Sequence, residues 1–420
     1  MKALRVERRL TKFAAARVAS AFGAGRGAGL GPLRLTDAPP PSGLGAGWVA
    51  VTPVLSGICG SDLATVDGRS SRYFENIVSF PFIPGHEIVG RLTEPSRDAH
   101  GHELVVGDRV VIQPVLGCAA RALPLCPGCT NGDVGRCENI SHGHLLPGLQ
   151  TGFCADTGGG WSEGPLLAHA SQLFCVPDTL DDHDAVVIEP MACALHAALR
   201  ARYRPEDTVA IIGAGTLGLG IVAAIDFLGH RQIAARPRRL IVGARYATQR
   251  QLADTFGADE VVPPEHLARA VRLATRSGVV GPPSGVAGQL SGGAHVVIDC
   301  VGSEQSLEQA LSIIAPGGRI VVVGMPGKVS VDLASLWQRE VELVGAYAYG
   351  TEDVDGVGVP TFDLATELVA HHRLGSLVSA RYPIDRFEEA LAHAGAAGRR
   401  GSIKIVFEVG PQKANHKRED

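Results

Sequence analysis

The sequence has little of what marks a membrane protein, a secreted protein or a nucleic-acid-binding protein. Its 420 residues carry a formal net charge of only −4, so neither nucleic acid nor a membrane surface is predicted as a partner. No apolar run reaches transmembrane length, because Gly, Asp or Arg interrupts the longest ones. No apolar signal core follows the charged residues 1–9, so we expect no secretory signal and a cytoplasmic location.

What the chain does have is typical of a folded globular protein. Hydrophobic residues make up 45% of it, charged residues 20%, and glycine occurs 53 times. A chain of this length is too long for one small core, which predicts two domains. Up to roughly residue 180, short apolar runs, many glycines and no long helix predict a small β-barrel-like domain.

The character of the chain changes at Glu189, after which apolar strands alternate with helical segments. This alternation predicts an α/β fold with a parallel, doubly wound sheet. The expected strands are residues 208–212, 240–242, 260–262, 295–299, 319–323 and 341–345. The expected helices are residues 190–199, 217–228, 249–256, 306–314, 333–339, 361–371 and 386–394. A last strand at 402–407 suits a return to the first domain.

Three segments are expected to lie outside regular structure. Residues 10–31 contain one short helical stretch at 11–19 and then a glycine-rich run, which predicts an insertion or mobile loop, with a basic contact patch as the alternative. Residues 278–291 are rich in Gly and Pro and are expected to form a loop. The polar tail at 410–420 is predicted to be disordered.

Three side chains of the first domain suit zinc. Cys59, His86 and Glu87 offer a thiolate, an imidazole and a carboxylate, and three protein ligands with one open position are typical of a catalytic zinc. Ser61 and Asp62 follow closely and are candidates for a proton relay and for support of the ligands. The alternative interpretation is a buried cysteine and a surface His–Glu pair that never meet.

Glu189 stands at the boundary between the two predicted domains, where a cleft is expected. Its carboxylate is a candidate for a fourth zinc ligand. The alternative is a carboxylate that the dipole of the following helix stabilises at its N-terminus.

Four of the nine cysteines lie within twenty residues, in the spacing C-x₇-C-x₂-C-x₇-C. They are Cys118, Cys126, Cys129 and Cys137. In a reduced compartment such crowding indicates metal rather than disulfides, and four thiolates close a tetrahedral structural zinc site. The other cysteines are expected to be small core residues: Cys154, Cys175, Cys193 and Cys300.

A glycine turn predicts a dinucleotide site. It lies between the strand at 208–212 and the helix that follows, and it comprises Gly213, Gly215, Thr216, Leu217 and Gly218. In this context the first glycine permits the tight turn, the second lets the backbone approach a pyrophosphate, and the third lets helix and strand pack closely. The helix N-terminus faces the anion. We expect Cys300, Val301 and Gly324 to complete the cofactor site.

The next strand carries no acid at its end that would bond a ribose 2′-hydroxyl. It ends instead at Ala244 and Arg245, with Arg250 one turn along the following helix. Guanidinium groups match a 2′-phosphate in charge and geometry, which favours NADP over NAD. The alternative is a solvated arginine beside either cofactor.

These motifs together resemble the zinc-dependent medium-chain dehydrogenase/reductase superfamily. The matching pieces occur in the family's order over nearly all of the chain: residues 57–62, 84–87, 107–110, the cysteine lobe, Glu189–Pro190, the glycine turn and residues 315–318. Glu189–Pro190–Met191, where alcohol dehydrogenases have Cys, makes the chain most similar to the polyol and threonine dehydrogenases.

The resemblance implies a Rossmann domain and a GroES-like β-barrel catalytic domain. It implies a catalytic zinc on Cys59, His86 and either Glu189 or Glu87, with Asp62 orienting His86 and Ser61 passing the alcohol proton outward. The chain departs from the family at Ala64, where a His is frequent, at Cys118, which lies farther from the second cysteine than usual, and in residues 10–31.

The domain organisation that follows has the catalytic zinc domain at 1–188, with its structural zinc lobe at 118–137. The dinucleotide-binding domain is expected at 189–348, the return to the catalytic domain at 349–410 and a disordered tail at 411–420.

The function predicted is hydride transfer between an alcohol or polyol and NAD(P), with Zn²⁺ as Lewis acid. The alternatives are a zinc-independent quinone or enone reductase of the same fold, a non-enzymatic nucleotide-binding protein and, with least support, a metal-storage protein.

The expected partners are a small-molecule substrate and further copies of the chain, as a dimer or tetramer, with 341–347 as a candidate edge strand. Tyr347 and Tyr349 are candidates near the nicotinamide, and the substrate itself stays open.

Overall fold

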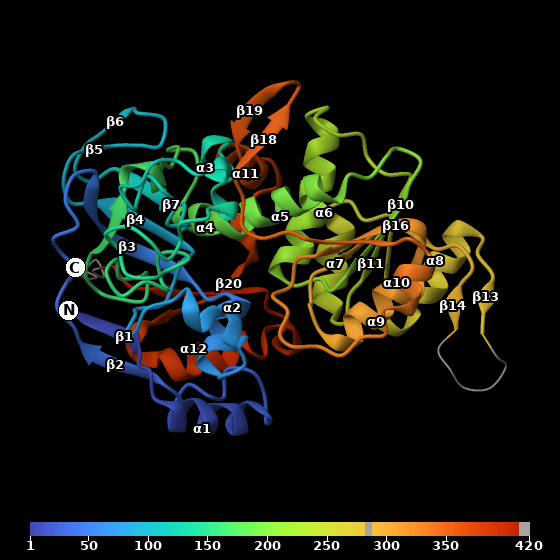
Figure 1. The fold of residues 1–420 in the computed structure, drawn as a ribbon, viewed down its shortest axis with the longest axis horizontal. Helices are drawn as coiled ribbons and strands as arrows, with labels where there is room; N and C mark the ends of the chain where they lie inside the picture. Colours follow the sequence, from blue (N-terminus) through green and yellow to red (C-terminus); the bar gives the residue numbers. More distant parts are fainter. Residues whose placement is uncertain (282–287, 411–420) are drawn as a thin grey trace, which may run out of the picture.

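The computed structural model of the chain describes residues 1–281 and 288–410 (Figure 1). The predicted tail at 411–420 lies outside the described residues, as does the middle of the predicted loop at 278–291. The described ends of that loop form two short antiparallel strands, β13 (Val279–Val280) and β14 (Gln289–Leu290), which the sequence did not predict. None of the described helices is long and apolar enough to cross a bilayer.

The first part of the chain forms a seven-stranded sheet in the order β20-β21-β3-β4-β7-β9, with β8 paired to β3. Its strands are β3 (Trp48–Gly57), β4 (Ile88–Leu92), β7 (Arg109–Ile112), β8 (Leu166–His169), β9 (Leu173–Cys175), β20 (Val378–Pro383) and β21 (Lys404–Glu408). The sheet therefore contains strands from both ends of the chain. Val406 of β21 pairs with Gly57 of β3, so the strand predicted at 402–407 does return to the first domain.

The second part is a six-stranded parallel sheet in the order β12-β11-β10-β15-β16-β17. Its strands are β10 (Thr208–Ile212), β11 (Arg239–Gly243), β12 (Glu260–Val262), β15 (Ala294–Asp299), β16 (Ile314–Val322) and β17 (Glu342–Gly345). Each lies at or close to a predicted strand. β16 begins five residues before the predicted strand, because it also includes the Pro-Gly-Gly segment. The strand order reverses between β10 and β15, where doubly wound sheets bind ligands.

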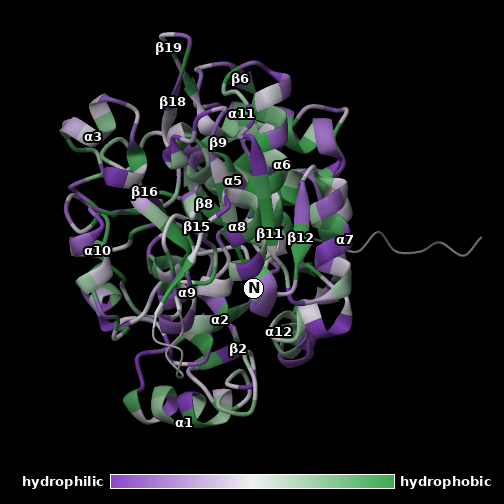
Figure 2. Cartoon of the chain, turned by 90° about the vertical axis from the view of Figure 1, so that its right-hand side faces the viewer, coloured by the Kyte–Doolittle hydropathy of each residue, from purple (hydrophilic) through white to green (hydrophobic). Residues whose placement is uncertain are grey.

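Helices cover both faces of the parallel sheet. Alternate residues of each strand point to opposite faces and pack against the helices there. In β10, Val209 and Ile211 pack with α5 (Ile188–Ala201) and α6 (Thr216–His230). Ala210 and Ile212 pack on the opposite face with α8 (Leu267–Thr275) and α9 (Glu304–Ile313). A strand that is buried on both faces has a continuous apolar sequence. Figure 2 shows that the neighbouring strand β11 is also mostly hydrophobic.

Residues 10–31 are a packed part of the first domain and not a mobile loop. They form α1 (Leu10–Ser20), which lies at the lower edge of that domain in Figure 1, followed by a series of turns. The backbone N–H groups of Gly25 and Gly27 donate to the buried carboxylate of Asp67 at 2.9 and 3.0 Å. This carboxylate fixes the glycine-rich turns beside α2 (Gly60–Val66).

The remaining strands form separate two-stranded sheets, and the remaining helices lie outside the two large sheets. Among the described residues the further strands are β1 (Lys2–Val6), β2 (Leu33–Asp37), β5 (Ser96–Arg97), β6 (Glu103–Leu104), β18 (Thr351–Val354) and β19 (Val357–Pro360). The further helices are α3 (Pro127–Thr130), α4 (Asp182–Val186), α7 (Ala247–Thr255), α10 (Ala334–Gln338), α11 (Thr361–His372) and α12 (Phe387–Ala394).

Candidate active site

Strand pairing brings Cys59, His86 and Glu87 together. Cys59 follows β3, His86 and Glu87 precede β4, and these strands are antiparallel neighbours in which Ser56 pairs with Ile88. One ligand atom from each of the three side chains lies within 4.8 Å of the others. His86 and Glu87 are buried, so the alternative of a surface His–Glu pair is wrong.

Asp62 supports two of these side chains from the first turn of α2. Its Oδ1 lies 3.4 Å from Nδ1 of His86, and its Oδ2 accepts the backbone N–H of Cys59 at 2.9 Å. Since Nδ1 of His86 faces Asp62, Nε2 is the nitrogen that remains for a metal. This is the supporting position that the sequence predicted for Asp62.

The charges around this group favour a cation. Burial alone would lower the pKa of His86, but Asp62 and then Cys59 outweigh burial and raise that pKa well above its usual value. Oδ1 of Asp62 and Nδ1 of His86 are buried without a hydrogen-bond partner among the described residues. A site with a thiolate, an imidazole and carboxylates that attracts positive charge fits Zn²⁺.

Glu189 lies beside this group but not within it. It stands in the first turn of α5, where its Oε1 accepts the hydroxyl of Tyr349 at 3.1 Å and has Sγ of Cys193 at 3.8 Å. Burial raises the pKa of Glu189 to about 7, and the charge of Glu87 adds to that rise. Of the two carboxylates that the resemblance left open, the structure places Glu87 within ligand distance of Cys59 and His86.

Lys404 is a site residue that the sequence reasoning missed. Its Nζ contacts Oε2 of Glu87 and donates to the carbonyl of Ile58 at 3.2 Å, and the side chain is 3% exposed. Burial alone would lower the pKa of Lys404, but Glu87 and then Cys59 raise it above the usual value. A single lysine within the apolar strand at 402–407 was the available signal.

Two hydroxyl groups next to Ser61 were also missed. Ser61 is half-buried and lines the cleft described below, as expected for a proton relay. The hydroxyl of Thr65 donates to the Ser61 carbonyl at 2.9 Å and lies 3.0 Å from the hydroxyl of Ser70. Thr65 and Ser70 line the same cleft, whereas Ala64 offers no polar side chain there.

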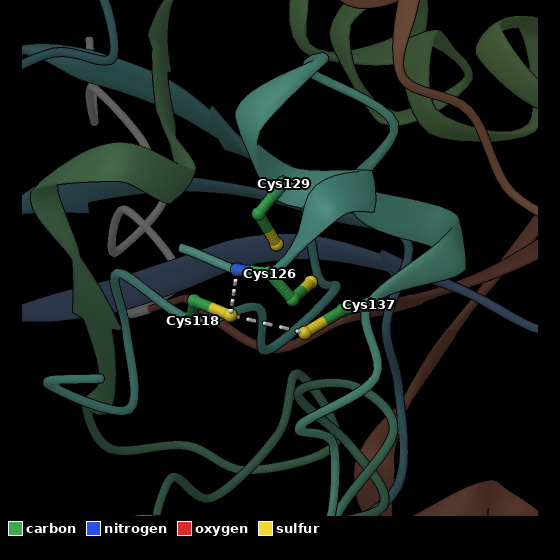
Figure 3. A group of neighbouring side chains, drawn as sticks. All are labelled: Cys118, Cys126, Cys129 and Cys137. Carbon is green, nitrogen blue, oxygen red and sulfur yellow. Dashed lines mark hydrogen bonds between the residues drawn. The ribbon is translucent and has the colours of Figure 1, made fainter. Parts of the chain in front are cut away.

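The four-cysteine group is brought together, including Cys118 (Figure 3). The four sulfur atoms lie within 4.8 Å of one another, and all four cysteines are free thiols. Backbone N–H groups point at the sulfurs, from Cys126 to Cys118 at 3.4 Å and from Glu138 to Cys126 at 3.5 Å. The Glu138 N–H lowers the pKa of Cys126 to about 6, which favours the thiolate. This donor set fits a structural zinc.

The glycine turn has the shape that a dinucleotide requires. Gly213 has φ = 92°, which lets the chain turn from β10 into α6. A Cβ on Gly218 would lie 2.0 Å from the Gly213 carbonyl oxygen, so this glycine allows helix and strand to approach. A Cβ on Gly215 would meet nothing within 4 Å, so open space lies over the turn. Thr216 is the first residue of α6.

The two arginines after β11 differ in their surroundings. Arg250 donates through Nη1 to the carbonyls of Ala244 and Arg245, at 3.3 and 2.8 Å. Arg245 is exposed and has no ion pair among the described residues. Arg245 is therefore the guanidinium available to a ligand at this strand end.

A single cleft of about 1540 Å³ connects the predicted sites. Its lining includes most of them: Cys59, Ser61, His86, Glu87, Glu189, Gly215, Thr216, Leu217, Gly218, Cys300, Val301 and Gly324. Among the predicted residues outside the lining, Asp62 lies behind His86 and Gly213 forms the turn below. Phe13 and Arg17 of α1 also line the cleft, so the segment at 10–31 forms part of its wall.

The chain matches the domains of one known protein family. The alcohol dehydrogenase GroES-like domain matches residues 45–178, and the zinc-binding dehydrogenase domain matches 218–362. A protein of Arthroderma otae named "Probable D-xylulose reductase A" is 30% identical over 357 residues, 82% of this chain and 86% of that protein. This chain belongs to the zinc-binding dehydrogenase family.

Further members of the zinc-binding dehydrogenase family are similar over most of their length. L-idonate 5-dehydrogenase of Vitis vinifera is 27% identical over 84% of this chain and 86% of the relative. The structure of a zinc-binding dehydrogenase-type protein from Sinorhizobium meliloti, bound to NADP, is 26% identical with a TM-score of 0.64, over 90% of this chain and 95% of the other. The 2R,3R-butanediol dehydrogenase of Bacillus subtilis, 21% identical with a TM-score of 0.66 over 97% and 99% of the two chains, shares the fold.

Membership of the zinc-binding dehydrogenase family confirms the predicted class. The fold is α/β, with a GroES-like domain and a Rossmann-type parallel sheet. The chain is a zinc-dependent oxidoreductase of the alcohol dehydrogenase type that uses NAD(P), and a non-enzymatic role is set aside.

Proposed function

We propose that this enzyme oxidises a polyol or sugar alcohol, and reduces the matching ketone, with NADP as its hydride carrier. One observation carries the proposal: a single cleft exposes Cys59, His86 and Glu87 at one place and the glycine turn at another. Relatives named for sorbitol, D-xylulose and L-idonate support the substrate class. The NADP-bound relative supports the choice of cofactor.

Cys59, His86 and Glu87 are the proposed ligands of the catalytic zinc, and Asp62 holds the first two in place. When bound, Zn²⁺ supplies a Lewis acid that polarises the substrate oxygen and lowers the pKa of the alcohol. Glu189 faces this group from α5, where the hydroxyl of Tyr349 holds its carboxylate. Glu189 would accept a hydrogen bond from a water or substrate hydroxyl bound beside these ligands.

The alcohol proton leaves through hydroxyl groups rather than through an imidazole at position 64. Ser61 takes the proton first, because it lies two residues after Cys59 and lines the same cleft. Thr65 and Ser70, 3.0 Å apart, provide the next hydroxyls toward solvent. Thr65→Val is expected to slow turnover while leaving zinc content unchanged, because it removes one hydroxyl and no ligand.

The other wall of the cleft orients the dinucleotide. Cys300, Val301 and Gly324 follow β15 and β16, the strands next to the point where the sheet order reverses. This supports a dinucleotide whose pyrophosphate lies on the α6 N-terminus and whose nicotinamide end points toward the proposed zinc ligands. The chain's contribution is to hold the two reacting carbons together and to keep water out.

Arg245 is the proposed partner of the 2′-phosphate, and a matched pair of variants tests it. Arg245→Gln is expected to weaken NADPH binding by about tenfold or more and to leave NADH binding unchanged, because a charge-assisted contact is lost. Arg238→Gln is the control, since this exposed arginine precedes β11 at the opposite end of the strand. Equal binding of NADPH by wild type and Arg245→Gln would contradict the assignment, as would tighter binding of NADH by wild type.

Metal content tests the two zinc sites separately. We expect two zinc ions per chain by mass spectrometry, of which Cys59→Ser loses the catalytic one and Cys118→Ser loses the structural one. Cys175→Ser is the control and retains both, since Cys175 is exposed, and not a core residue as predicted, and lies outside both groups. Full turnover by Cys59→Ser would favour the zinc-independent reductase.

The proposed oligomer forms through β17. This strand is at one end of the parallel sheet. Its Leu343 is 47% exposed, and Trp337, in the preceding helix α10, is 80% exposed. An open edge with apolar side chains is suited to pairing with a second copy around a two-fold axis. Leu343→Lys is expected to shift the mass measured by light scattering from a dimer to a monomer; an unchanged mass would exclude this edge.

The proposed location is the cytoplasm. All nine cysteines are free, and a site of four thiolates requires a compartment that keeps thiols reduced. Fractionation of cells that express the tagged chain tests this location.

A further inference from the structure

Away from the cleft, two helices bring three histidines and an aspartate together. Asp226 and His230 stand one turn apart on α6, so their side chains share one face of that helix. His371 and His372 are the last two residues of α11. One ligand atom each from Asp226, His230 and His371 lies within 4.8 Å of the others. None of these residues lines the cleft.

His372 lies next to this group and contacts its carboxylate. Its Nε2 lies 3.5 Å from Oδ2 of Asp226 and is buried without a hydrogen-bond partner among the described residues. The ring centroid of His371 is 4.7 Å from that of His372 and 5.1 Å from that of His230. Nε2 of His230 and Nε2 of His372 thus lie 4.0 and 3.5 Å from the same carboxylate oxygen of Asp226, with the His371 ring beside both imidazoles.

The surroundings of Asp226 orient that oxygen. Nη1 of Arg236 donates to Oδ1 of Asp226 at 3.2 Å, and Nη2 donates to the carbonyl of Gly257. Arg236 therefore holds one carboxylate oxygen and leaves Oδ2 facing His230 and His372, as outer residues do for metal ligands.

Both helices end at this cluster, and their C-termini are a second feature that favours a bound cation. α6 ends at His230 and α11 ends at His372. A helix C-terminus carries a partial negative charge, so two converging C-termini stabilise a cation.

We propose that Asp226, His230 and His371, with His372 beside them, form a binding site for a divalent transition-metal ion of the kind that imidazole prefers, such as Zn²⁺, Ni²⁺ or Cu²⁺. Imidazole nitrogens together with one carboxylate oxygen are a donor set for such ions rather than for Mg²⁺ or Ca²⁺. A bound ion ties α6 of the nucleotide-binding sheet to α11, which leads back to the first domain. The site is therefore structural and distinct from both zinc sites.

The experiment is a titration of the purified enzyme, loaded with zinc and desalted, with Ni²⁺ in a calorimeter. We expect one further equivalent of Ni²⁺ to bind, while the two zinc ions stay in place by mass spectrometry. His230→Ala and the double variant His371→Ala/His372→Ala are expected to weaken this binding by about tenfold or more, because each removes ligands. His266→Ala, at an exposed histidine on another surface, is the control and binds like wild type.

Two further measurements keep the test independent of enzyme activity. Cu²⁺ bound to the zinc-loaded enzyme is expected to give an electron paramagnetic resonance spectrum with nitrogen splitting, which His230→Ala alters. Ni²⁺ is expected to raise the Tm of wild type but not that of the double variant, because the ion binds the folded state. The proposal is overturned if no equivalent of Ni²⁺ binds, or if the variants bind it as tightly as wild type does.

Discussion

Lys404 and Glu87 form a buried ion pair that joins the last strand of the first domain to the loop that carries His86. Lys404 comes from β21 and Glu87 precedes β4, and both strands flank β3 in the sheet. The lysine also holds the Ile58 carbonyl, one residue before Cys59. One cation from the C-terminal part of the chain thus positions two of the proposed zinc ligands.

Removing this cation is expected to destabilise the fold as well as the site. In the zinc-free protein, Lys404→Met leaves the buried Glu87 carboxylate without its counter-charge, which costs about 3–5 kcal/mol in the free energy of unfolding. Urea unfolding measures the loss. The double variant Lys404→Met/Glu87→Gln removes both charges and is expected to regain a large part of it. If the two variants are equally unstable, the pair is not what holds this loop.

Two glycines of the dinucleotide turn are expected to differ in their effects on cofactor binding and on stability. Gly215→Ala is expected to leave the Tm unchanged, because its Cβ meets nothing, and to weaken dinucleotide binding by filling the space over the turn. Gly218→Ala is expected to lower both, because its Cβ would meet the Gly213 carbonyl. Fluorescence titration with NADPH and thermal unfolding distinguish the two. Unimpaired binding by Gly215→Ala would place the pyrophosphate elsewhere.

Asp67 is expected to anchor the segment that follows α1. Asp67→Ala leaves the buried N–H groups of Gly25 and Gly27 unpaired, which costs at least about 2 kcal/mol. Protease is then expected to cut within residues 20–31. Arg69→Gln is the control, because this half-exposed ion pair with Asp67 contributes at most about 1 kcal/mol. A resistant Asp67→Ala protein would show that other contacts hold α1.

His169 is expected to make stability depend on pH. Its Nδ1 accepts the N–H of Ser171 at 3.2 Å, which requires a neutral ring, and burial with the nearby His144 lowers its pKa from 6.5. A lowered pKa contributes stability that is present above about pH 6.5 and is lost as the pH falls through the folded value.

The variant His169→Asn isolates this contribution, because it keeps an acceptor but does not titrate. The difference in the free energy of unfolding between wild type and His169→Asn is expected to shrink as the pH falls from about 7.5 to about 5. Urea unfolding at several pH values measures it. A constant difference would mean that folding does not shift the pKa of this ring.

Much of the site could be predicted because its chemistry is local in the sequence. The glycine turn needs only a strand before it and a helix after it, and both are visible in the apolar pattern around Gly213. Cys126 and Cys129 form a short metal-binding turn whatever surrounds them. Cys118 was less certain from its spacing, and it joined the group only when the chain folded back and the Asn139 side chain donated to its sulfur at 3.2 Å.

The sequence by itself determined the ligand types, the dinucleotide turn and the order of the two domains, because these depend on residue chemistry and on neighbours along the chain. Only the tertiary structure decided that Glu87 rather than Glu189 lies within ligand distance of Cys59, and that Lys404 neutralises it. It also decided that α1 lines the cleft and that four side chains meet where α6 and α11 end. These relationships depend on which strands and helices lie side by side, and such pairing depends on the packing of the whole chain and not on the local pattern.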